Sequence, residues 1–178
     1  LCDRRQRQMC IRDSVWGMSE LTSVSLGTTI TTIPAACFSN CTSLTTLTLP
    51  SSITSISGGT STFTSVTVSS GNVTATPNIS FGSEVNYPAF YGSGLTTIDL
   101  SNVTSYQTTS GSTLSLPNTL FYNCPSLTTV TLKEGTTAIG SGSFARTPLL
   151  TTINTGSTTS SSGYVATSNI TSVGSYAF

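Results

Sequence analysis

Hydroxyl and thiol groups are the side chains of this sequence that could do chemistry. The 178 residues include 36 Thr, 32 Ser and 5 Cys, but no His. A serine or threonine becomes a nucleophile when a neighbouring base takes its proton, and histidine is the commonest such base. In residues 15–178 there are four carboxylates, and no two of them share a short motif. The sequence therefore predicts a protein that is not an enzyme and uses no cofactor.

The charged side chains gather at the N-terminus. Six of the twelve lie in the first 14 residues: Asp3, Arg4, Arg5, Arg7, Arg12 and Asp13. The run DRRQRQMCIRDS back-translates into codons that resemble a transposase sequencing adapter. We therefore interpret residues 1–14 as a non-native, disordered segment and residues 15–178 as a fragment truncated at both ends. A native basic arm for nucleic acid or membranes is the alternative.

Residues 15–178 have few charges to offer to a partner. They contain two basic residues, Lys133 and Arg146, so nucleic-acid binding is not expected. Their longest apolar run is far shorter than the ~18–20 residues that a membrane-spanning helix needs, so no membrane insertion is expected either.

One spacing of apolar residues recurs along these 164 residues. The series that begins at Leu21 repeats 23 residues later at Leu44, with five matched pairs. Further copies begin at Phe63, Leu95, Leu127 and Leu150, and Ile170, Val173 and Phe178 repeat the last part of the unit. A fixed period of 20–50 residues is the sequence signature of a solenoid, because one repeat cannot bury its own apolar edge.

Each repeat contains the pattern of a short strand. In TSLTTLTLP, Leu47 and Leu49 alternate with Thr46 and Thr48, so the leucines share one face and the threonines the other. Pro50 then ends the strand. We expect a repeat solenoid of about six coils, a right-handed superhelix of short parallel strands and turns with little helix.

The segments CFSNCTSLTTLTLPSSITSI and LFYNCPSLTTVTLKEGTTAIGSGSF resemble BspA-type leucine-rich repeats. Cys41 and Cys124 stand three residues before the strand leucine, as in that family, whereas Gly92 and Thr147 replace this cysteine in other copies. The resemblance covers about residues 21–178, with departures at 51–88 and 151–169. It implies a secreted or cell-surface protein that adheres to extracellular proteins or glycans through a concave strand face.

By strand alternation, this face should carry a row of small hydroxyls with two charges. The candidate binding residues are Thr46, Thr48, Ser65, Thr67, Thr97, Asp99, Thr129, Thr131, Lys133, Thr152 and Asn154. Strand propensity alone is the competing explanation of the threonines. Ice binding is a further alternative, disfavoured because Asp99 and Asn154 interrupt the row.

Cys37, Cys41 and Cys124 could form a metal or redox set. A Cys-x₃-Cys pair with a distant third cysteine and no histidine is a weak metal signal. Cys41 and Cys124 fall in separate coils, beyond disulfide reach. We expect no metal site and predict three thiols that fill small buried slots, with a local Cys37–Cys41 disulfide as the alternative.

The sequence thus favours a non-catalytic adhesion or protein-interaction scaffold at the cell surface. Two alternatives stay open: a structural stalk, and a repeat segment of a larger surface enzyme.

Overall fold

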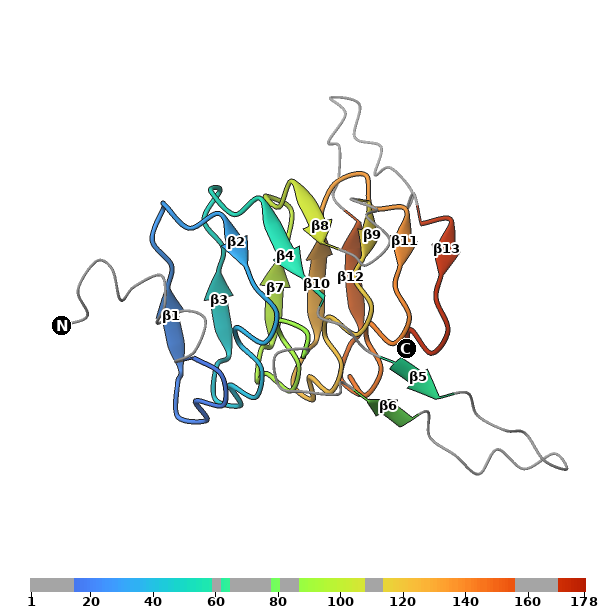
Figure 1. The fold of residues 1–178 in the computed structure, drawn as a ribbon, viewed down its shortest axis with the longest axis horizontal. Helices are drawn as coiled ribbons and strands as arrows, with labels where there is room; N and C mark the ends of the chain where they lie inside the picture. The colour runs from blue at the N-terminus through green and yellow to red at the C-terminus, as the bar shows by residue number, and fades with distance from the viewer. Residues whose placement is uncertain (1–14, 59–61, 65–77, 81–86, 108–113, 156–169) are drawn as a thin grey trace, which may run out of the picture.

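Short parallel strands and turns make up the chain. The computed structural model describes residues 15–58, 62–64, 78–80, 87–107, 114–155 and 170–178, and it contains no helix in these ranges. All the strands except β5 and β6 are stacked along a single axis (Figure 1). They are β1 (Ser23–Ser25), β2 (Thr32–Ile33), β3 (Thr46–Thr48), β4 (Ser55–Ser57), β5 (Thr62–Thr64), β6 (Asn78–Ser80), β7 (Thr97–Asp99), β8 (Ser105–Gln107), β9 (Ser115–Leu116), β10 (Thr129–Leu132), β11 (Ala138–Ile139), β12 (Thr152–Thr155) and β13 (Ser172–Val173).

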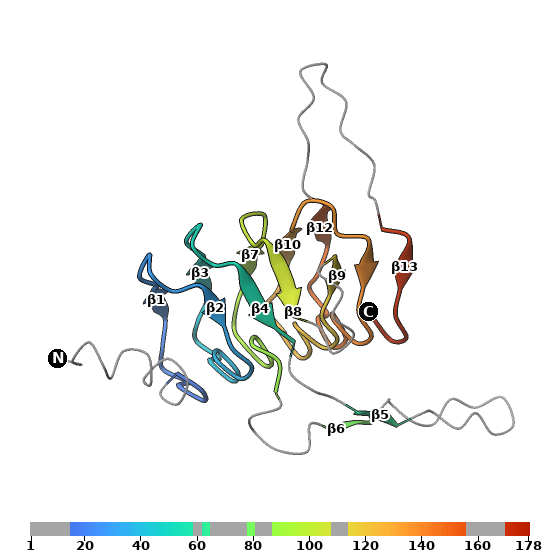
Figure 2. The same cartoon turned by 45° about the horizontal axis from the view of Figure 1, so that its top comes forward.

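Two layers of parallel strands run along the stack. The long sheet has the order β1-β3-β7-β10-β12, with one strand from each of five coils. The other layer consists of two three-stranded sheets, β2-β4-β8 and β9-β11-β13 (Figure 2). Equivalent residues pair without offset, as Val24 does with Leu47 and Val130 with Ile153. The predicted repeat solenoid is therefore confirmed.

Alternation along each strand decides which side chains enter the core. In β3, Leu47 is buried, whereas Thr46 and Thr48 are exposed. β7 repeats the pattern, with Ile98 buried between the exposed Thr97 and Asp99. The apolar set of every inner coil thus points between the two layers, where it packs against the sets of the coils above and below.

Stacked phenylalanine rings form a column through this core. Phe38, Phe90, Phe121 and Phe144 are at most 1% exposed. Neighbouring ring centroids are 5.4–5.9 Å apart, and the planes are within 7° of parallel. Phe178 continues the column on Phe144 at 5.6 Å and 20°. Each ring comes from a different coil, so the stacking of the rings holds successive coils together.

Two positions after each buried phenylalanine of the column, a residue with a left-handed backbone conformation turns the chain. Asn40, Gly92, Asn123 and Arg146 occupy this place in successive coils, with φ between 58° and 63°. Glycine and asparagine tolerate this region better than other residues, which accounts for three of the four. The turns are joined by backbone hydrogen bonds, such as Asn40 N–H to Tyr91 O at 2.7 Å and Asn123 N–H to Ala145 O at 2.9 Å.

The copy expected to begin at Phe63 does not join the stack, so that prediction is wrong. β3 pairs directly with β7, through Thr46 and Thr97. β5 instead pairs antiparallel with β6, which places Phe63 opposite Ile79. This two-stranded ribbon lies apart from the long sheet (Figure 2). The physical reason is the strand pairing: β7, from the copy at Leu95, pairs directly with β3, from the copy at Leu44, so β5 lies outside the long sheet.

Gly94 allows a close approach between two of these coils. A Cβ atom at this position would lie 2.0 Å from the Thr42 carbonyl oxygen of the preceding coil. Gly94→Ala should therefore lower the free energy of unfolding by about 1–3 kcal/mol, the usual effect of overpacking. Thermal and urea unfolding would measure the change. Gly27→Ala is the matched control, because no atom lies within 4 Å of the place that its added methyl group would take; equal effects of the two substitutions would contradict the steric argument.

Candidate binding surface

The outward side chains of the long sheet form two parallel rows. Strand pairing brings the first residues of the strands into line: Ser23, Thr46, Thr97, Thr129 and Thr152. The second row lies two residues further along each strand and consists of Ser25, Thr48, Asp99, Thr131 and Asn154. Neighbouring strands of a sheet lie ~4.8 Å apart, so each row repeats its polar groups at that spacing. We call these ten residues the hydroxyl face.

The structure brings most of the predicted binding residues together on this face. Thr46, Thr48, Thr97, Asp99, Thr152 and Asn154 are exposed, and Thr129 and Thr131 are half-buried. Lys133 directly follows β10, outside the ten residues, and is half-buried. Ser65 and Thr67 lie outside the described residues. The β3–β7 pairing leaves no position between these strands for the copy to which the two residues were assigned.

The charged groups of Asp99, in the second row, and Lys133, which follows β10, form local hydrogen bonds. One oxygen of the Asp99 carboxylate accepts a bond from the Ser101 backbone N–H at 2.8 Å. The Lys133 ammonium donates to the Glu134 carbonyl at 3.1 Å. Asn154 donates from its amide nitrogen to the Thr131 hydroxyl at 3.4 Å. The face is therefore a nearly neutral surface of hydroxyl and methyl groups, suited to hydrogen bonding and van der Waals contact.

A second set of threonines, which the sequence pattern did not single out, joins the coils. Thr45, Thr96, Thr128 and Thr151 each stand immediately before a strand of the long sheet. Thr96 donates to the Thr45 carbonyl both from its hydroxyl at 3.1 Å and from its backbone N–H at 3.0 Å. Thr128 does the same to Thr96, with both distances 2.9 Å. We call this series the threonine clamp.

The clamp had a visible signal in the sequence. Each of these strands begins at the second residue of a Thr-Thr pair, at 45–46, 96–97, 128–129 and 151–152. Thr96, Thr128 and Thr151, each the first member of its pair, donate to the preceding coil, whereas the second members lie on the hydroxyl face. Some of the threonines are therefore present because they join the coils, and others lie on the hydroxyl face.

An aromatic cluster lies at the turns that follow the phenylalanine column. The rings of Tyr87 and Tyr91 are 4.7 Å apart, and Tyr91 stacks on Tyr122 at 5.7 Å. The Arg146 guanidinium lies 5.6 Å from the centre of the Tyr122 ring, within cation–π distance. Burial and the neighbouring tyrosines raise the pKa of Tyr91, while Arg146 opposes this shift. Side chains of neighbouring coils therefore also stack on each other outside the core, through this cluster.

The three described cysteines, Cys37, Cys41 and Cys124, are buried thiols, as the sequence predicted. Burial raises the pKa of Cys37 to about 12, with a smaller contribution from Cys41. Burial also raises the pKa values of Cys41 and Cys124 to about 11. Cys41 donates to the Val15 carbonyl at 2.8 Å and Cys124 to the Phe90 carbonyl at 3.0 Å. These thiols are thus neutral at physiological pH and serve as small packing groups with a donor.

The described residues contain neither a metal-binding cluster nor a membrane-spanning helix. No group of three or more cysteine or carboxylate side chains in them could hold a metal ion. Within the same ranges, no helix has the length and apolar character needed to cross a membrane.

Comparison with known families identifies the repeat. The family model described as "BspA type Leucine rich repeat region (6 copies)" matches residues 9–109 and 59–169. The chain belongs to the BspA-type leucine-rich repeat family. The matched residues include all five strands of the long sheet. Membership of this family indicates a protein-interaction repeat scaffold.

Two solved structures are similar to this BspA-type chain. A leucine-rich repeat protein from Eubacterium ventriosum ATCC 27560 is 19% identical, with a TM-score of 0.50 over 89% of this chain and 42% of the other. A leucine-rich repeat protein from Bacteroides ovatus ATCC 8483 is 18% identical, with a TM-score of 0.38 over 89% and 41%. The chain thus spans about two fifths of the length of either protein. The first similarity supports the leucine-rich repeat fold, and no curated protein matched the sequence.

The threonine clamp predicts a measurable contribution to stability. Thr128→Val keeps the shape of the side chain but removes the hydroxyl that binds Thr96. We expect a loss of about 0.5–1.5 kcal/mol of unfolding free energy, the usual net value of a hydrogen bond. Thr97→Val, at an exposed position of the hydroxyl face, is the control and should change stability less. Urea unfolding of both variants measures the difference, and a larger loss in Thr97→Val would refute the clamp.

Proposed function

We propose that this protein is a non-catalytic adhesion scaffold that acts at the cell surface and binds extracellular proteins or glycans through the hydroxyl face. The observation that carries the proposal is the in-register alignment of outward polar side chains over five coils. Such a surface can contact an extended partner at many equivalent points. The family supports the interaction role, and its members' frequent association with surfaces supports the location.

Multivalent contact is the mechanism that this geometry favours. Each coil offers two outward side chains per strand, mostly hydroxyls, and a single hydroxyl contributes little net affinity. Five coils held in one rigid stack present their groups together, which raises the effective concentration of each contact after the first one forms. A partner with a repeating hydrogen-bonding surface, such as an extended glycan or a glycosylated protein, fits this arrangement.

The composition of the face also supports binding rather than catalysis. Its only carboxylate, Asp99, is engaged with a backbone N–H, and the chain has no histidine to activate a hydroxyl. The near neutrality of the face means that affinity should depend only weakly on ionic strength.

Lysine substitutions on the face test the proposal. Thr97→Lys with Thr131→Lys places two long charged side chains in the middle of the rows. Binding to a surface coated with a mucin glycoprotein should fall at least about tenfold, equal to ~1.4 kcal/mol. Ser51→Lys with Asn102→Lys is the matched control, because both residues are exposed in turns that follow strands of the long sheet.

The outcomes separate the alternatives. Binding that is retained by the deglycosylated mucin indicates a protein partner, and binding lost with the glycans indicates a carbohydrate partner. Wild-type binding to neither form, or equal binding by the face variant and the control, would overturn the proposal and leave the structural stalk as the better account.

A further inference from the structure

The second row of the hydroxyl face departs from the serine and threonine pattern at two positions. On β1, β3 and β10 the row carries Ser25, Thr48 and Thr131, whereas β7 carries Asp99 and β12 carries Asn154. Asp99 is the only carboxylate among the ten residues of the face, and Asn154 is the only amide. Aspartate and asparagine are depleted in strands, so strand propensity, which can explain the threonines, does not explain these two residues.

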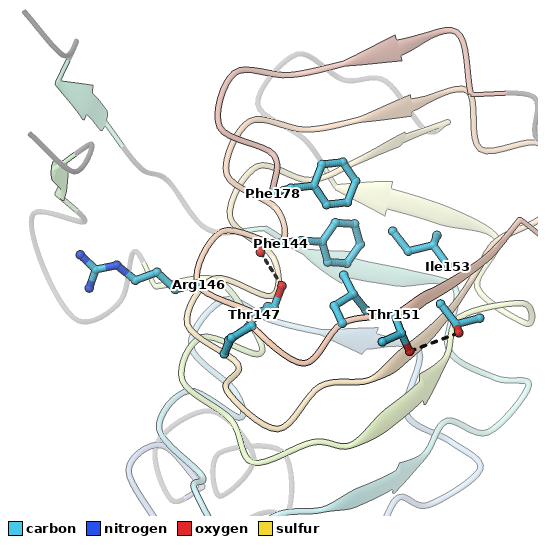
Figure 3. A pocket seen from close by; sticks show the side chains of 9 residues that line it. Phe144, Arg146, Thr147, Thr151, Ile153 and Phe178 are labelled. Carbon is cyan, nitrogen blue, oxygen red and sulfur yellow. Dashed lines mark hydrogen bonds between the residues drawn. The ribbon is translucent and has the colours of Figure 1, made fainter. Parts of the chain in front are cut away.

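The two departures flank one threonine. Thr131 pairs with Asp99 on one side and with Asn154 on the other, because β10 lies between β7 and β12. Ile153 lies beside the last two rings of the phenylalanine column (Figure 3), so the next residue of β12, Asn154, points to the opposite side of the sheet. Asp99 and Asn154 are exposed, and Thr131 is half-buried. We call these three residues the Asp–Thr–Asn group, which spans ~10 Å along the stack.

Existing hydrogen bonds decide which atoms of the group are available to a ligand. The Oδ1 atom of Asp99 accepts from the Ser101 backbone N–H at 2.8 Å, which orients the carboxylate and leaves its Oδ2 atom as an acceptor. Asn154 donates from Nδ2 to the Thr131 hydroxyl oxygen at 3.4 Å. Since that oxygen accepts this bond, the Thr131 proton can be donated to a ligand. The group thus offers a charged acceptor, a hydroxyl donor and an amide on three adjacent strands.

Two hydroxyls on neighbouring carbons of a sugar complement this arrangement. A hydroxyl both donates and accepts, so one of the pair can donate to Asp99 while the other accepts from Thr131. A hydroxyl that donates to a carboxylate forms a bond about twice as strong as one between neutral groups. The Asp99 charge would repel a carboxylate, sulfate or phosphate of a ligand, so the group favours a neutral sugar.

We infer that the Asp–Thr–Asn group anchors a neutral glycan on the hydroxyl face through a pair of hydroxyls on adjacent carbons. The inference rests on the proposed function, because it names the ligand class of the same face. Asp99 and Thr131 bind the hydroxyl pair, and Asn154 binds the neighbouring part of the glycan along the stack. The other hydroxyls of the face add weaker contacts to this anchor.

Chemical treatment of the mucin glycoprotein tests the ligand class. Sialidase removes the acidic sugars, and the protein should bind the treated mucin as well as the untreated one. Periodate cleaves the bond between carbons that carry adjacent hydroxyls. After periodate and then borohydride, binding to the desialylated mucin should fall at least about tenfold.

Variants of single carboxylates test the anchor itself. Asp99→Asn keeps the shape of the side chain and an oxygen that can accept from Ser101, but it removes the charge. Its affinity for the desialylated mucin should be at least about tenfold lower than that of the wild type. Glu134→Gln is the matched control, because it removes an exposed carboxylate of the turn after β10, and it should bind like the wild type. Circular dichroism verifies that both variants are folded.

The outcomes distinguish a failure of this inference from a failure of the proposed function. Binding that survives periodate, binding lost with sialic acid, or equal binding by Asp99→Asn and Glu134→Gln would each overturn the inference. The proposed function would stand in all three cases if Thr97→Lys with Thr131→Lys still abolished binding. Equal binding by that face variant and its control would overturn both.

Discussion

Contact between successive coils is the interaction on which the rest of this structure depends. No coil encloses its own apolar side chains, so each one is stable only while its neighbours cover them. Besides the strand pairing, three systems make the contact: the phenylalanine column in the core, the threonine clamp before β3, β7, β10 and β12, and the hydrogen bonds between turns. Because all three repeat with the coil, they fix one register for the whole stack. The hydroxyl face is a consequence of that register.

The same contact explains why a chain with an apolar core is so rich in polar residues. Inward positions of the strands, such as Leu47 and Ile98, are apolar and buried. Positions before the strands need a side chain that donates back to the preceding coil, and outward positions need a strand-forming residue that tolerates water. Threonine meets both needs, because its hydroxyl can donate and its branched Cβ suits a strand. Neither the inward nor the outward positions of a coil need a charged side chain, which agrees with the low charge content of residues 15–178.

The sequence predicted the solenoid and most of the hydroxyl face from one pattern, the alternation of leucine and threonine at a recurring spacing. That pattern is local, so it located the strands at Thr46, Thr97, Thr129 and Thr152 correctly. It failed at Phe63, where a matching spacing occurs in a segment that pairs antiparallel instead. The spacing of apolar residues around Phe63 cannot reveal that the coils of β3 and β7 pair directly with each other. The bonds of the clamp could not be predicted from a local pattern for a related reason, since they join residues 23 to 51 positions apart.

Amide hydrogen exchange, followed by NMR at a concentration where the chain is monomeric, tests the dependence on neighbouring coils most directly. If stacking stabilises each coil, protection should be greatest in the middle of the stack and fall toward both ends. The amides of Thr96 and Thr128, which bond to preceding coils in the interior, should then exchange more slowly than that of Gly17 in the first coil. Equal protection of the terminal and the middle coils would contradict the account, because it would show that a coil is stable without a neighbour on each side.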